Sequence, residues 1–441
     1  MSGDKYKSFF EEMQNKFYWK INQYIPLCYP CPGLEIELSP KRKHETCPEC
    51  GCMRTYVHER KERRIHGGTF TGVPVMYKME RIRHICRECG VTFVDEYECL
   101  PWYCGMTTET EAYIVWSLGS MTMTDIAEEI GVSVQTISNR AAAFGRQERE
   151  TMLSGCYRYL SMDEIFMGRD KNGKHNIYWV LNDISTPWKS NNILIDKGRT
   201  KAEVIKRLGQ LAHPESVMAV CIDMWKPYLE AVEDVFPQAE IVIDRFHVMK
   251  LASESINTAR INADVSPEMK AAMKKDASLF LASIYKLSDD DLVKLDNYLK
   301  ADPLLEATYF FVQELMEFYN IRGYDRALEY LCKWETEVIK SGINLPIYKT
   351  ICEWLPYIMN FFHFRITSGK TEGRNNLIRQ IDRMGFHYGL DGLQACIYAH
   401  DRKQEYIKWQ KYMRNKNLHS FEADSYCSDF LSSKSSEKTA A

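Results

Sequence analysis

The stretch CIDMWKPYLEAVEDVFPQAEIVIDRFHV, residues 221–248, decides the fold. It contains the end of one apolar strand, an amphipathic helix and a second apolar strand, and the two strands end at Asp223 and Asp244. Strands that alternate with helices are typical of a sheet covered by helices. An acid at the end of such a strand lies at the edge of the sheet where binding sites are placed in these folds.

Three further strands are predicted before this stretch, and the first carries an acid in its interior. Their segments are YRYLSMDEIF, NIYWVLND and NNILID, and the amphipathic helix TKAEVIKRLGQL follows them. Three consecutive strands followed by alternating helices and strands predict a mixed sheet covered by helices. The acid in the first strand is Asp163.

A third acid, Glu372, follows a long helical region. Residues 251–365 are predicted to be helical almost throughout, and strands do not resume after them. Glu372 then opens a helix in TSGKTEGRNNLIRQ, residues 367–380, among basic and amide side chains. A surface helix with ion pairs would explain this setting. A carboxylate that binds metal would also explain it, with neighbours that face a DNA backbone: Lys370, Arg374 and Asn375.

The three acids Asp163, Asp223 and Glu372 together predict a metal site. Any one of them alone is more often a cap or turn residue, but three that converge would repel one another unless a divalent cation neutralised them. Mg²⁺ (or Mn²⁺) prefers oxygen ligands and leaves positions for water and substrate phosphates. Two such ions can activate an attacking oxygen and stabilise a leaving one, so we expect phosphoryl-transfer chemistry.

Two matching cysteine pairs predict a zinc ribbon. They lie in TCPECG and ICRECG, each a C-x-x-C followed by glycine, and the four residues are Cys47, Cys50, Cys86 and Cys89. Four thiolates on two such turns form a tetrahedral zinc site. The 35 residues between the pairs exceed the usual spacing, so an extended hairpin must fill the gap. A redox pair, or ligation by Cys52 or His58, is a weaker alternative.

Length and composition predict a cytoplasmic protein with more than one domain. The chain has 441 residues, 45% of them hydrophobic, and neither a signal-peptide pattern nor an apolar run long enough for a membrane span. Its 15 cysteines are odd in number and mostly isolated, as in reduced proteins. The further pair Cys28 and Cys31 has no obvious partner pair and is interpreted as a turn.

The segment from Lys41 to Phe93 has a local excess of positive charge. It contains 12 basic and 6 acidic residues, a difference of +6, whereas the whole chain has a net charge of −3. Local basic charge provides most of the non-specific affinity for DNA, so the segment is a candidate phosphate-binding surface. A solvated charged surface explains the same count equally well.

The stretch TDIAEEIGVSVQTISNR, residues 124–140, predicts a helix-turn-helix. Thr124 is expected to cap the first helix and Gly131 to end it. The second helix is expected to place three apolar side chains inward: Val134, Ile137 and Ala141. Its outward residues include types that contact base edges, which favours DNA binding over an ordinary helical hairpin: Gln135, Thr136, Ser138, Asn139 and Arg140.

These motifs together resemble the ISL-type bacterial insertion-sequence transposases. The resemblance rests on CPEC and CREC, TDIAEEIGVSVQTISNR, SMDE, SGKTEGRNN and the opening stretch, which extend from about residue 47 to 390. It implies an RNase H-like domain in which Asp163, Asp223 and Glu372 are the DDE triad, with a helical insertion before the last acid. It also implies double-stranded DNA as partner, a homodimer or higher oligomer as the active complex, and a place in the bacterial cytoplasm at the nucleoid.

Three other residues near the predicted triad are candidates for supporting roles. Asp244 and His247 belong to the D-R-F-H run, and His247 is interpreted as a contact to the scissile phosphate, a proton carrier or a buried structural histidine. Trp225 can stack on an unpaired base, although a large aromatic beside a sheet is more often part of the core.

The expected organisation is that of a multidomain α+β and α/β chain. We expect an N-terminal helical or irregular segment (1–40), a zinc ribbon (41–100), a helix-turn-helix (105–150), an RNase H-like mixed sheet (155–250), a helical insertion (251–365), the last helices of the sheet domain (366–415) and a disordered tail (416–441).

The predicted function is metal-dependent cleavage of DNA at the ends of an insertion sequence and transfer of the 3′-hydroxyl to target DNA. The terminal inverted repeats would be bound by the ribbon and the helix-turn-helix. Two alternatives remain: a structure-directed nuclease without strand transfer, and a zinc-dependent DNA-binding regulator with an inactive RNase H-like domain. A thiol redox protein is a poor third alternative, because no thioredoxin-like context surrounds the cysteine pairs.

Overall fold

The computed structural model describes most of the chain and divides it into two compact units. The described residues are 19–27, 33–40, 46–70, 73–94, 105–169, 172–186, 191–385 and 388–415. The first unit comprises Met1–Glu148 with Arg383–Ala441, and the second comprises Arg149–Asp382. The predictions for Cys28, Cys31 and the tail at 416–441 lie outside the described residues.

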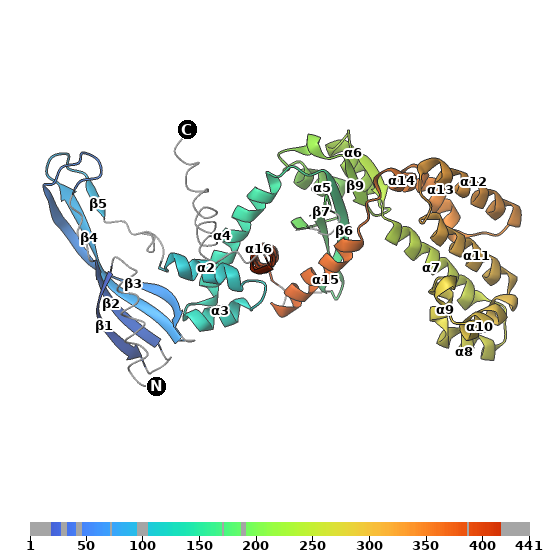
Figure 1. Cartoon of the computed structure of the whole chain (residues 1–441), viewed down its shortest axis with the longest axis horizontal. Coiled ribbons are helices and arrows are strands. Elements are labelled where there is room, and N and C mark those ends of the chain that lie inside the picture. Colours follow the sequence, from blue (N-terminus) through green and yellow to red (C-terminus); the bar gives the residue numbers. More distant parts are fainter. Residues whose placement is uncertain are drawn as a thin grey trace. The chain divides into compact units, whose positions relative to one another are not determined.

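The first unit contains a five-stranded sheet (Figure 1). Its strands are β1 (Trp19–Leu27), β2 (Gly33–Pro40), β3 (Thr55–Phe70), β4 (Val73–Cys86) and β5 (Thr92–Val94). The order is β1-β2-β4-β3, with β5 paired to β4, and only the β2–β4 pair is parallel. The antiparallel β3–β4 hairpin fills the long gap between the two cysteine pairs.

The prediction of a helical or irregular segment over residues 1–40 is wrong for the strands β1 and β2. In β2 three apolar residues are buried and alternate with glutamates: Leu34, Ile36 and Leu38. This period of two is the signal of a half-buried strand. The flanking cysteine and proline residues obscured that short pattern in the sequence.

The helices of the first unit, among the residues that the structure describes, are α2 (Thr108–Ser117), α3 (Met123–Ile130), α4 (Val134–Leu153), whose last residues belong to the second unit, and α16 (Leu390–Asn415). The cap of α3 is Thr122, two residues before the predicted Thr124, because Thr122 and Asp125 form a reciprocal capping box. Gly131 ends α3 in a left-handed conformation, as predicted. Ile137 and Ala141 are buried, but Val134 is 44% exposed, so its predicted inward position is wrong: it opens α4, before the buried face begins.

The second unit is built around a mixed five-stranded sheet. Its strands are β6 (Tyr159–Arg169), β7 (His175–Asp183), β8 (Asn191–Lys197), β9 (Ala219–Ile222) and β10 (Glu240–Ile243), in the order β10-β9-β6-β7-β8. The pairs β10–β9 and β9–β6 are parallel, and the pairs β6–β7 and β7–β8 are antiparallel. The predicted mixed sheet, with Asp163 inside its first strand, is confirmed.

The helices that neighbour these strands in the chain or pack on them are α5 (Lys201–Leu208), α6 (Lys226–Val235), α7 (Arg245–Asn262) and α15 (Gly369–Met384), with the short η1 (Pro214–Ser216). Side chains of β6 point alternately to opposite faces. Ser161 and Asp163 contact α15, whereas Glu164 contacts Tyr228 of α6. Thus α15 and α6 lie on opposite faces, and Asp163 faces α15.

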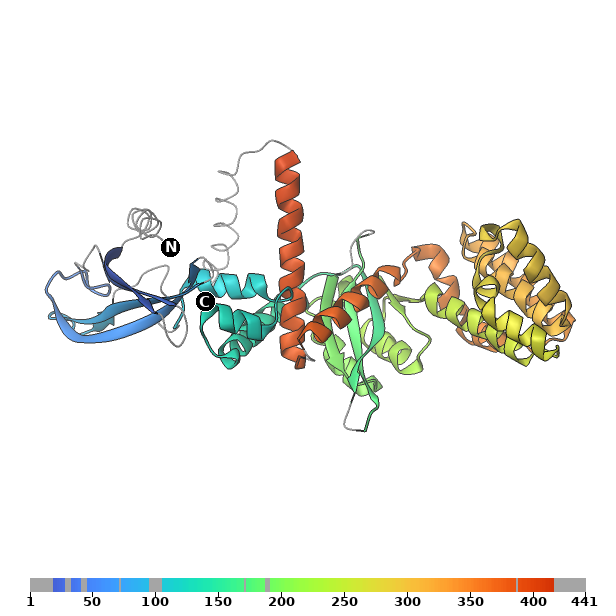
Figure 2. The ribbon, with the colours of Figure 1, turned by 90° about the horizontal axis from the view of Figure 1, so that it is seen from below.

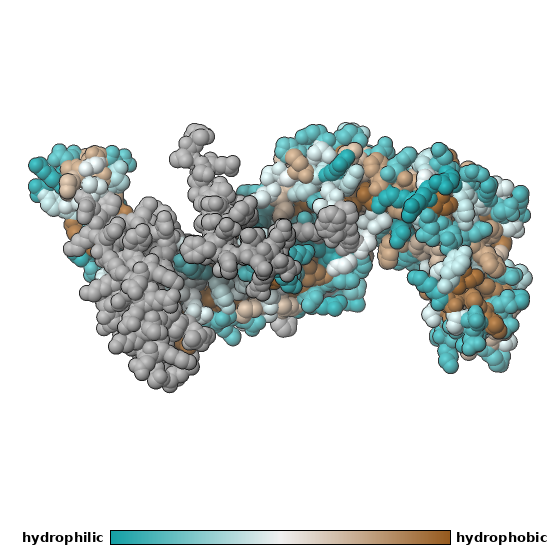
Figure 3. All heavy atoms as spheres, viewed as in Figure 1, coloured by the Kyte–Doolittle hydropathy of each residue, from teal (hydrophilic) through white to brown (hydrophobic). Residues whose placement is uncertain are grey.

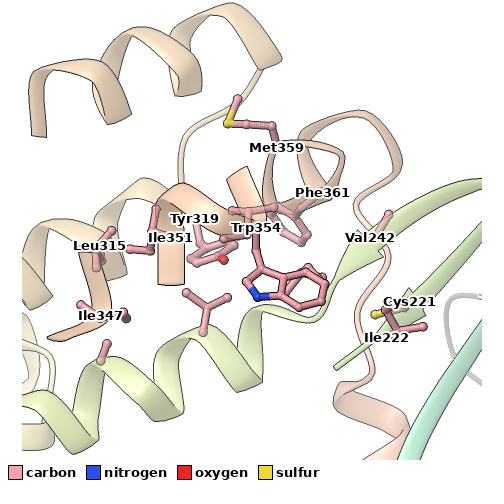
Figure 4. Packing of buried hydrophobic residues seen from close by; sticks show 14 of the residues in the cluster. Cys221, Ile222, Val242, Leu315, Tyr319, Ile347, Ile351, Trp354, Met359 and Phe361 are labelled. Carbon is pink, nitrogen blue, oxygen red and sulfur yellow. The ribbon is translucent and has the colours of Figure 1, made fainter. Parts of the chain in front are cut away.

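Residues 251–365 are helical, as the sequence predicts. After α7 they form α8 (Pro267–Lys275), α9 (Ala277–Leu281), η2 (Ile284–Lys286), α10 (Asp289–Lys300), α11 (Pro303–Phe318), α12 (Tyr324–Ser341), α13 (Pro346–Met359) and α14 (Phe361–Phe364). Figure 2 shows them gathered at one end of the second unit. One hydrophobic cluster joins them to the sheet, and Figure 4 shows Trp354 and Phe361 beside Val242 of β10. This shared core fixes the helices against the sheet edge.

Polar side chains dominate the visible surface of the second unit, apart from an apolar area over α9 and α10 (Figure 3). Within the described part of the chain, no helix is both long and apolar enough to span a membrane.

Candidate functional site

Two aspartates and a histidine meet at the edge of the second unit's sheet. Asp163 lies in β6, Asp223 follows β9, and His247 lies in the first turn of α7. The Nε2 atom of His247 is 2.7 Å from Oδ1 of Asp223 and 3.8 Å from Oδ1 of Asp163. The three ligand atoms lie within 4.8 Å of one another. Parallel pairing of β6 with β9 brings the two carboxylates together, since both project from the same edge.

Helix α15 supports this group from one side. Asn375 Nδ2 donates to Asp163 Oδ2 at 2.6 Å, and one turn earlier Thr371 shares a hydroxyl hydrogen bond of 2.8 Å with Ser161. Asp163 Oδ1 accepts from the backbone N–H of Glu164 at 2.8 Å. Both carboxylate oxygens of Asp163 are therefore held in place by hydrogen bonds. The two buried contacts, Asn375 to Asp163 and Thr371 to Ser161, fix the position of α15 along the sheet.

Asp244 supports the group from the other side. It is buried at the N-terminus of α7, and its Oδ2 lies 4.0 Å from His247 Nε2. Ser368, just before α15, donates to Asp244 through both its backbone N–H and its hydroxyl. This contact ties the start of α15 to the start of α7, the two helices that carry Asn375 and His247.

The local electrostatics oppose a doubly ionised pair of aspartates in the absence of a cation. Burial, with the nearby negative charge of Asp223, raises the pKa of Asp163 to about 7. Burial lowers the pKa of His247, but the hydrogen bond to Asp223 and the surrounding acids raise it by more, so the net shift is upward. The site therefore attracts positive charge, and protonation of His247 is favoured by its acidic neighbours.

These donors fit a divalent cation. The group offers carboxylate oxygens and one imidazole nitrogen, within the distance that one ion can span. A cation that replaces the proton on Asp163, whose pKa is raised, would stabilise the two neighbouring carboxylates. Asp223 is partly accessible, with 17% of its side chain exposed, so water and substrate can reach the position between the acids.

Glu372, the third predicted ligand, is not brought to the two aspartates. It lies in the first turn of α15 with 47% of its side chain exposed, and its Oε1 is 3.5 Å from Arg379 Nη1. Arg374 is buried, which leaves little of it for a DNA backbone, and the side chain of Lys370 lies outside the described residues. Asn375 is fully buried and contacts Asp163.

Trp225 follows Asp223 by two residues, at the start of α6, and is exposed. Its ring stacks on the guanidinium of Arg199, whose carbon is 4.1 Å from the ring centroid. Arg199 also pairs with Glu164 at 2.7 Å, and Tyr228 donates to the same carboxylate at 3.1 Å. Trp225 is thus held by a charged network and is not part of the apolar core.

The four predicted zinc cysteines converge in the first unit. The Sγ atoms of Cys47 and Cys89 are 3.7 Å apart, and those of Cys50 and Cys86 are 3.6 Å apart. A tetrahedral site with Zn–S bonds of about 2.3 Å has S–S edges of about 3.8 Å, so the cluster can hold zinc. The backbone N–H of Cys89 is the largest influence on the Cys86 thiol and helps lower its pKa to about 6. Cys52 is not in the cluster, and its sulfur accepts from the N–H of Arg54.

The predicted DNA-reading residues lie at the start of α4. Gln135 and Asn139 are exposed and hydrogen-bonded to each other at 2.9 Å, one turn apart. Arg140 is half-buried and pairs with Glu111 of α2 at 3.2 Å. Thr136 and Ser138 are also half-buried, and the hydroxyl of Ser133 caps the helix start by accepting from the backbone N–H of Thr136.

Comparison with known proteins decides the family. A profile described as a transposase of the ISL3 type matches residues 160–395, more than half of the chain, and one described as the helix-turn-helix domain of transposase family ISL3 matches residues 96–144. The chain belongs to the ISL3 family of transposases. The transposase for insertion sequence element IS1001 of Bordetella parapertussis is 26% identical over 368 residues, which cover 81% of this chain and 89% of that protein.

Membership in the ISL3 transposases makes the chain an insertion-sequence transposase with a DDE domain and a helix-turn-helix. Such enzymes cleave and transfer DNA, and a DDE domain implies a divalent metal. The helix-turn-helix implies that the chain binds DNA.

Several residues of the site were missed by reasoning from sequence. Ser161, Thr371 and Ser368 are ordinary polar residues whose partners are distant in the chain. A usable signal existed for two of them: Ser161 lies two residues before Asp163 on the same strand face, and Thr371 lies four residues before Asn375 on the same helix face. No comparable signal marked Arg199 or Glu164.

Proposed function

We propose that the chain uses divalent metal, Mg²⁺ or Mn²⁺, to hydrolyse DNA at the ends of its insertion sequence and to join the freed 3′-hydroxyl to target DNA. The observation that carries this proposal is the convergence of Asp163, Asp223 and His247 at the sheet edge. The strand order and mixed pairing support an RNase H-like fold for this unit. In this chain, these three residues would then carry out the DNA cleavage and transfer that is general to the family.

Each residue of the group has a distinct role in the proposal. Asp163 and Asp223 hold the metal, which when bound activates the attacking oxygen and stabilises the leaving oxygen. Asn375 keeps Asp163 Oδ2 in place through its 2.6 Å hydrogen bond. His247, whose pKa is raised on balance by the hydrogen bond to Asp223 and the surrounding acids, contacts the scissile phosphate or carries a proton. Asp244 orients His247 and α15.

Glu372 is proposed as the third acid of the triad. It lies three residues before Asn375 on α15, and residues at this spacing are neighbours on a helix surface. Its present partner Arg379 is held more closely by Asn376, at 2.8 Å, than by Glu372, at 3.5 Å. Release from Arg379, when that arginine contacts a DNA phosphate, would free the Glu372 carboxylate for the metal.

DNA recognition is assigned to the first unit. Gln135, Asn139 and Arg140 at the start of α4 are proposed to read bases of the terminal inverted repeats, with Thr136 and Ser138 beside them. The basic ribbon, with zinc on its four cysteines, is proposed to bind the DNA backbone. Cutting and joining two ends requires at least two protomers, so we propose a homodimer or higher oligomer at the nucleoid of the bacterial cytoplasm.

The experiment uses the native DNA that flanks the gene. Labelled end fragments are incubated with purified protein and Mg²⁺ or Mn²⁺, and both cut and joined products are mapped. A Glu372→Ala variant is the test of the third acid, and Glu353→Ala, an exposed acid paired with Lys226, is the matched control.

The proposal predicts cuts at the element ends and joined products, both lost in Glu372→Ala and kept in Glu353→Ala. Cuts without joined products would instead indicate a nuclease. Tight binding with no cutting by any of the proteins would indicate a DNA-binding regulator.

A further inference from the structure

Arg199 lies on the sheet face opposite α15, and its side chain contacts both of the segments that carry the metal acids. Its Nε atom is 2.7 Å from Oε1 of Glu164, the residue after Asp163 in β6. Its guanidinium carbon lies 4.1 Å from the ring centroid of Trp225, two residues after Asp223. One side chain, from the loop between β8 and α5, therefore joins the two segments.

The Glu164 end of this bridge is connected to the Asp163 carboxylate through the backbone. The N–H of Glu164 donates to Asp163 Oδ1 at 2.8 Å. The Glu164 side chain is only 11% exposed, and the hydroxyl of Tyr228 donates to its Oε1 at 3.1 Å. Burial and the negative charges of Glu164 and Asp223 raise the pKa of Tyr228, so its hydroxyl remains a donor at neutral pH. A fixed Glu164 side chain therefore also fixes the N–H that orients Asp163.

The Trp225 end of the bridge restrains the turn that carries Asp223. The backbone N–H of Trp225 donates to the carbonyl of Asp223 at 2.8 Å, and α6 begins at the next residue. Stacking of a cation on an exposed tryptophan face contributes about 0.5–1 kcal/mol. Arg199 therefore holds the start of α6, and with it the turn at Asp223, toward β6.

Arg199 is itself anchored at the start of α5. Its backbone N–H donates to Glu203 Oε2 at 3.2 Å, and the same oxygen accepts from the backbone and the hydroxyl of Thr200. A planar guanidinium can pair with a carboxylate at its edge while its face stacks on an aromatic ring, which the ammonium group of lysine cannot do. The residue type at position 199 therefore fits a bridge between Glu164 and Trp225.

We propose that Arg199 is a positioning residue for the metal site. By holding Glu164 and Trp225 together, it keeps the two aspartates at the separation that one divalent ion can span. This inference rests on the proposed function, which takes Asp163 and Asp223 as the ligands. Electrostatics alone predicts the opposite effect when Arg199 is removed, because loss of a nearby cation strengthens the attraction of the acids for metal. A weaker metal site after removal is therefore the signature of positioning.

The test measures Mn²⁺ binding to the zinc-loaded full chain without DNA, from the loss of the electron paramagnetic resonance signal of free Mn²⁺. Asp223→Asn identifies the binding that belongs to the acid group. Arg199→Met is expected to weaken this binding on the order of ten-fold, as is usual when a residue that orients a metal ligand is lost.

Arg207→Met is the matched control and is expected to leave Mn²⁺ binding unchanged. Arg207 pairs with Asp196, and 37% of its side chain is exposed, against 38% for Arg199. The strand register places Asp196 and Glu164 on the same face of the sheet, each opposite Trp179 of β7. The control thus removes an equally exposed arginine–carboxylate pair that does not join the acid-bearing segments.

A second readout separates positioning from a contact with DNA. In cleavage of labelled element ends, Arg199→Met is expected to raise the half-maximal Mn²⁺ concentration about ten-fold, while the rate at saturating Mn²⁺ stays within about two-fold. Its affinity for the ends is expected to be unchanged. Arg199→Lys keeps the charge but not the planar group, so it should show most of the same loss of Mn²⁺ affinity.

Mn²⁺ binding by Arg199→Met that equals or exceeds that of the unaltered protein would overturn the inference. So would an equal loss in Arg207→Met, which would indicate a general effect of removing a surface ion pair. A lower affinity for DNA ends with unchanged Mn²⁺ binding would make Arg199 a DNA contact instead. If Asp223→Asn bound Mn²⁺ as tightly as the unaltered protein, the metal assignment of the proposed function would fail, and this inference with it.

Discussion

Asp163 has the most constrained carboxylate of the site. It is nearly fully buried, each of its oxygens accepts a hydrogen bond, and its pKa is raised to about 7 by burial and by Asp223. An aspartate in an unfolded chain has a pKa of about 3.9. The folded state therefore holds a proton that the unfolded state releases between these pH values, and the free energy of unfolding falls as pH rises from about 4 to 7.

Asp163→Asn is accordingly expected to stabilise the metal-free protein above pH 7. The gain is on the order of a few kcal/mol, since each pKa unit corresponds to about 1.4 kcal/mol, and it disappears below about pH 4. Thermal unfolding in EDTA at pH 8 and pH 4 measures the effect as a rise of several degrees at pH 8 only. An equal shift at both pH values would contradict the electrostatic explanation.

Asn375→Ala tests how much the fixed orientation of the Asp163 carboxylate contributes to the rate of DNA cleavage. Without the 2.6 Å hydrogen bond, Asp163 Oδ2 can rotate, and we expect cleavage to fall about ten-fold or more with unchanged affinity for DNA ends. Asn376→Ala is the matched control, because Asn376 is the exposed next residue and contacts Arg379. Equal losses in the two variants, or none in Asn375→Ala, would contradict the role assigned to Asn375.

The two aspartates could be predicted from the sequence because each is marked by its strand. Asp223 follows an apolar run, and Asp163 lies inside another, so sheet geometry alone brings them to one edge. The place of Glu372 could not be predicted in the same way. Its position depends on the rotation of α15 about its axis, which Thr371 and Asn375 set through partners more than 200 residues away.

At the scale of secondary-structure elements, helix α3 shows how a cap decides a boundary. Two threonines, Thr122 and Thr124, precede its buried face, and only the first forms the reciprocal contact with Asp125. The sequence pattern T-x-x-D was present, but the neighbouring threonine masked it. The buried residues Ile126 and Ile130 fit the predicted helical period.

Thr122→Ala is expected to destabilise α3 by about 1 kcal/mol, because the backbone N–H of Asp125 loses its acceptor, the Thr122 hydroxyl. Amide exchange in α3 should then accelerate about five-fold, measured by hydrogen–deuterium exchange on the whole protein. Thr124→Ala, an exposed position, is the control and should leave exchange unchanged. Faster exchange in Thr124→Ala alone would restore the cap predicted from sequence.

At the scale of the whole molecule, the sequence predicted which kinds of module are present better than how residues 251–365 pack against the sheet. The cysteine spacing, the helix-turn-helix and the mixed sheet each depend on short-range patterns and are all present. The core that joins residues 251–365 to β10 depends on long-range packing of residues such as Trp354 and Phe361. Periodicity shows that such residues face inward but not which surface they contact.

The cysteine cluster is expected to hold one zinc ion per chain and to depend on Cys50. Zinc on Cys47, Cys50, Cys86 and Cys89 is expected to stabilise the ribbon, because the described buried cluster at these cysteines adds only Phe93 to Cys47 and Cys86. Cys50→Ser should lose zinc, measured as metal content after dialysis, while Cys52→Ser should retain it because Cys52 accepts only from Arg54. Retention in Cys50→Ser and loss in Cys52→Ser would reassign the ligand.

The central claim is that Asp163 and Asp223 hold the metal that supports DNA cleavage, and the most direct measurement compares Asp223→Asn with the unaltered protein. Labelled element ends are used to measure both the affinity of binding and the rate of strand cleavage in Mn²⁺. Asp234→Asn is the control, because Asp234 is an exposed acid of the same unit that pairs with Lys201.

The account predicts that Asp223→Asn binds the ends as tightly as the unaltered protein but cleaves them at least about a hundred-fold more slowly, since a metal-ligand carboxylate is lost. Asp234→Asn should match the unaltered protein in both measurements. Full cleavage by Asp223→Asn would contradict the assignment of the metal site.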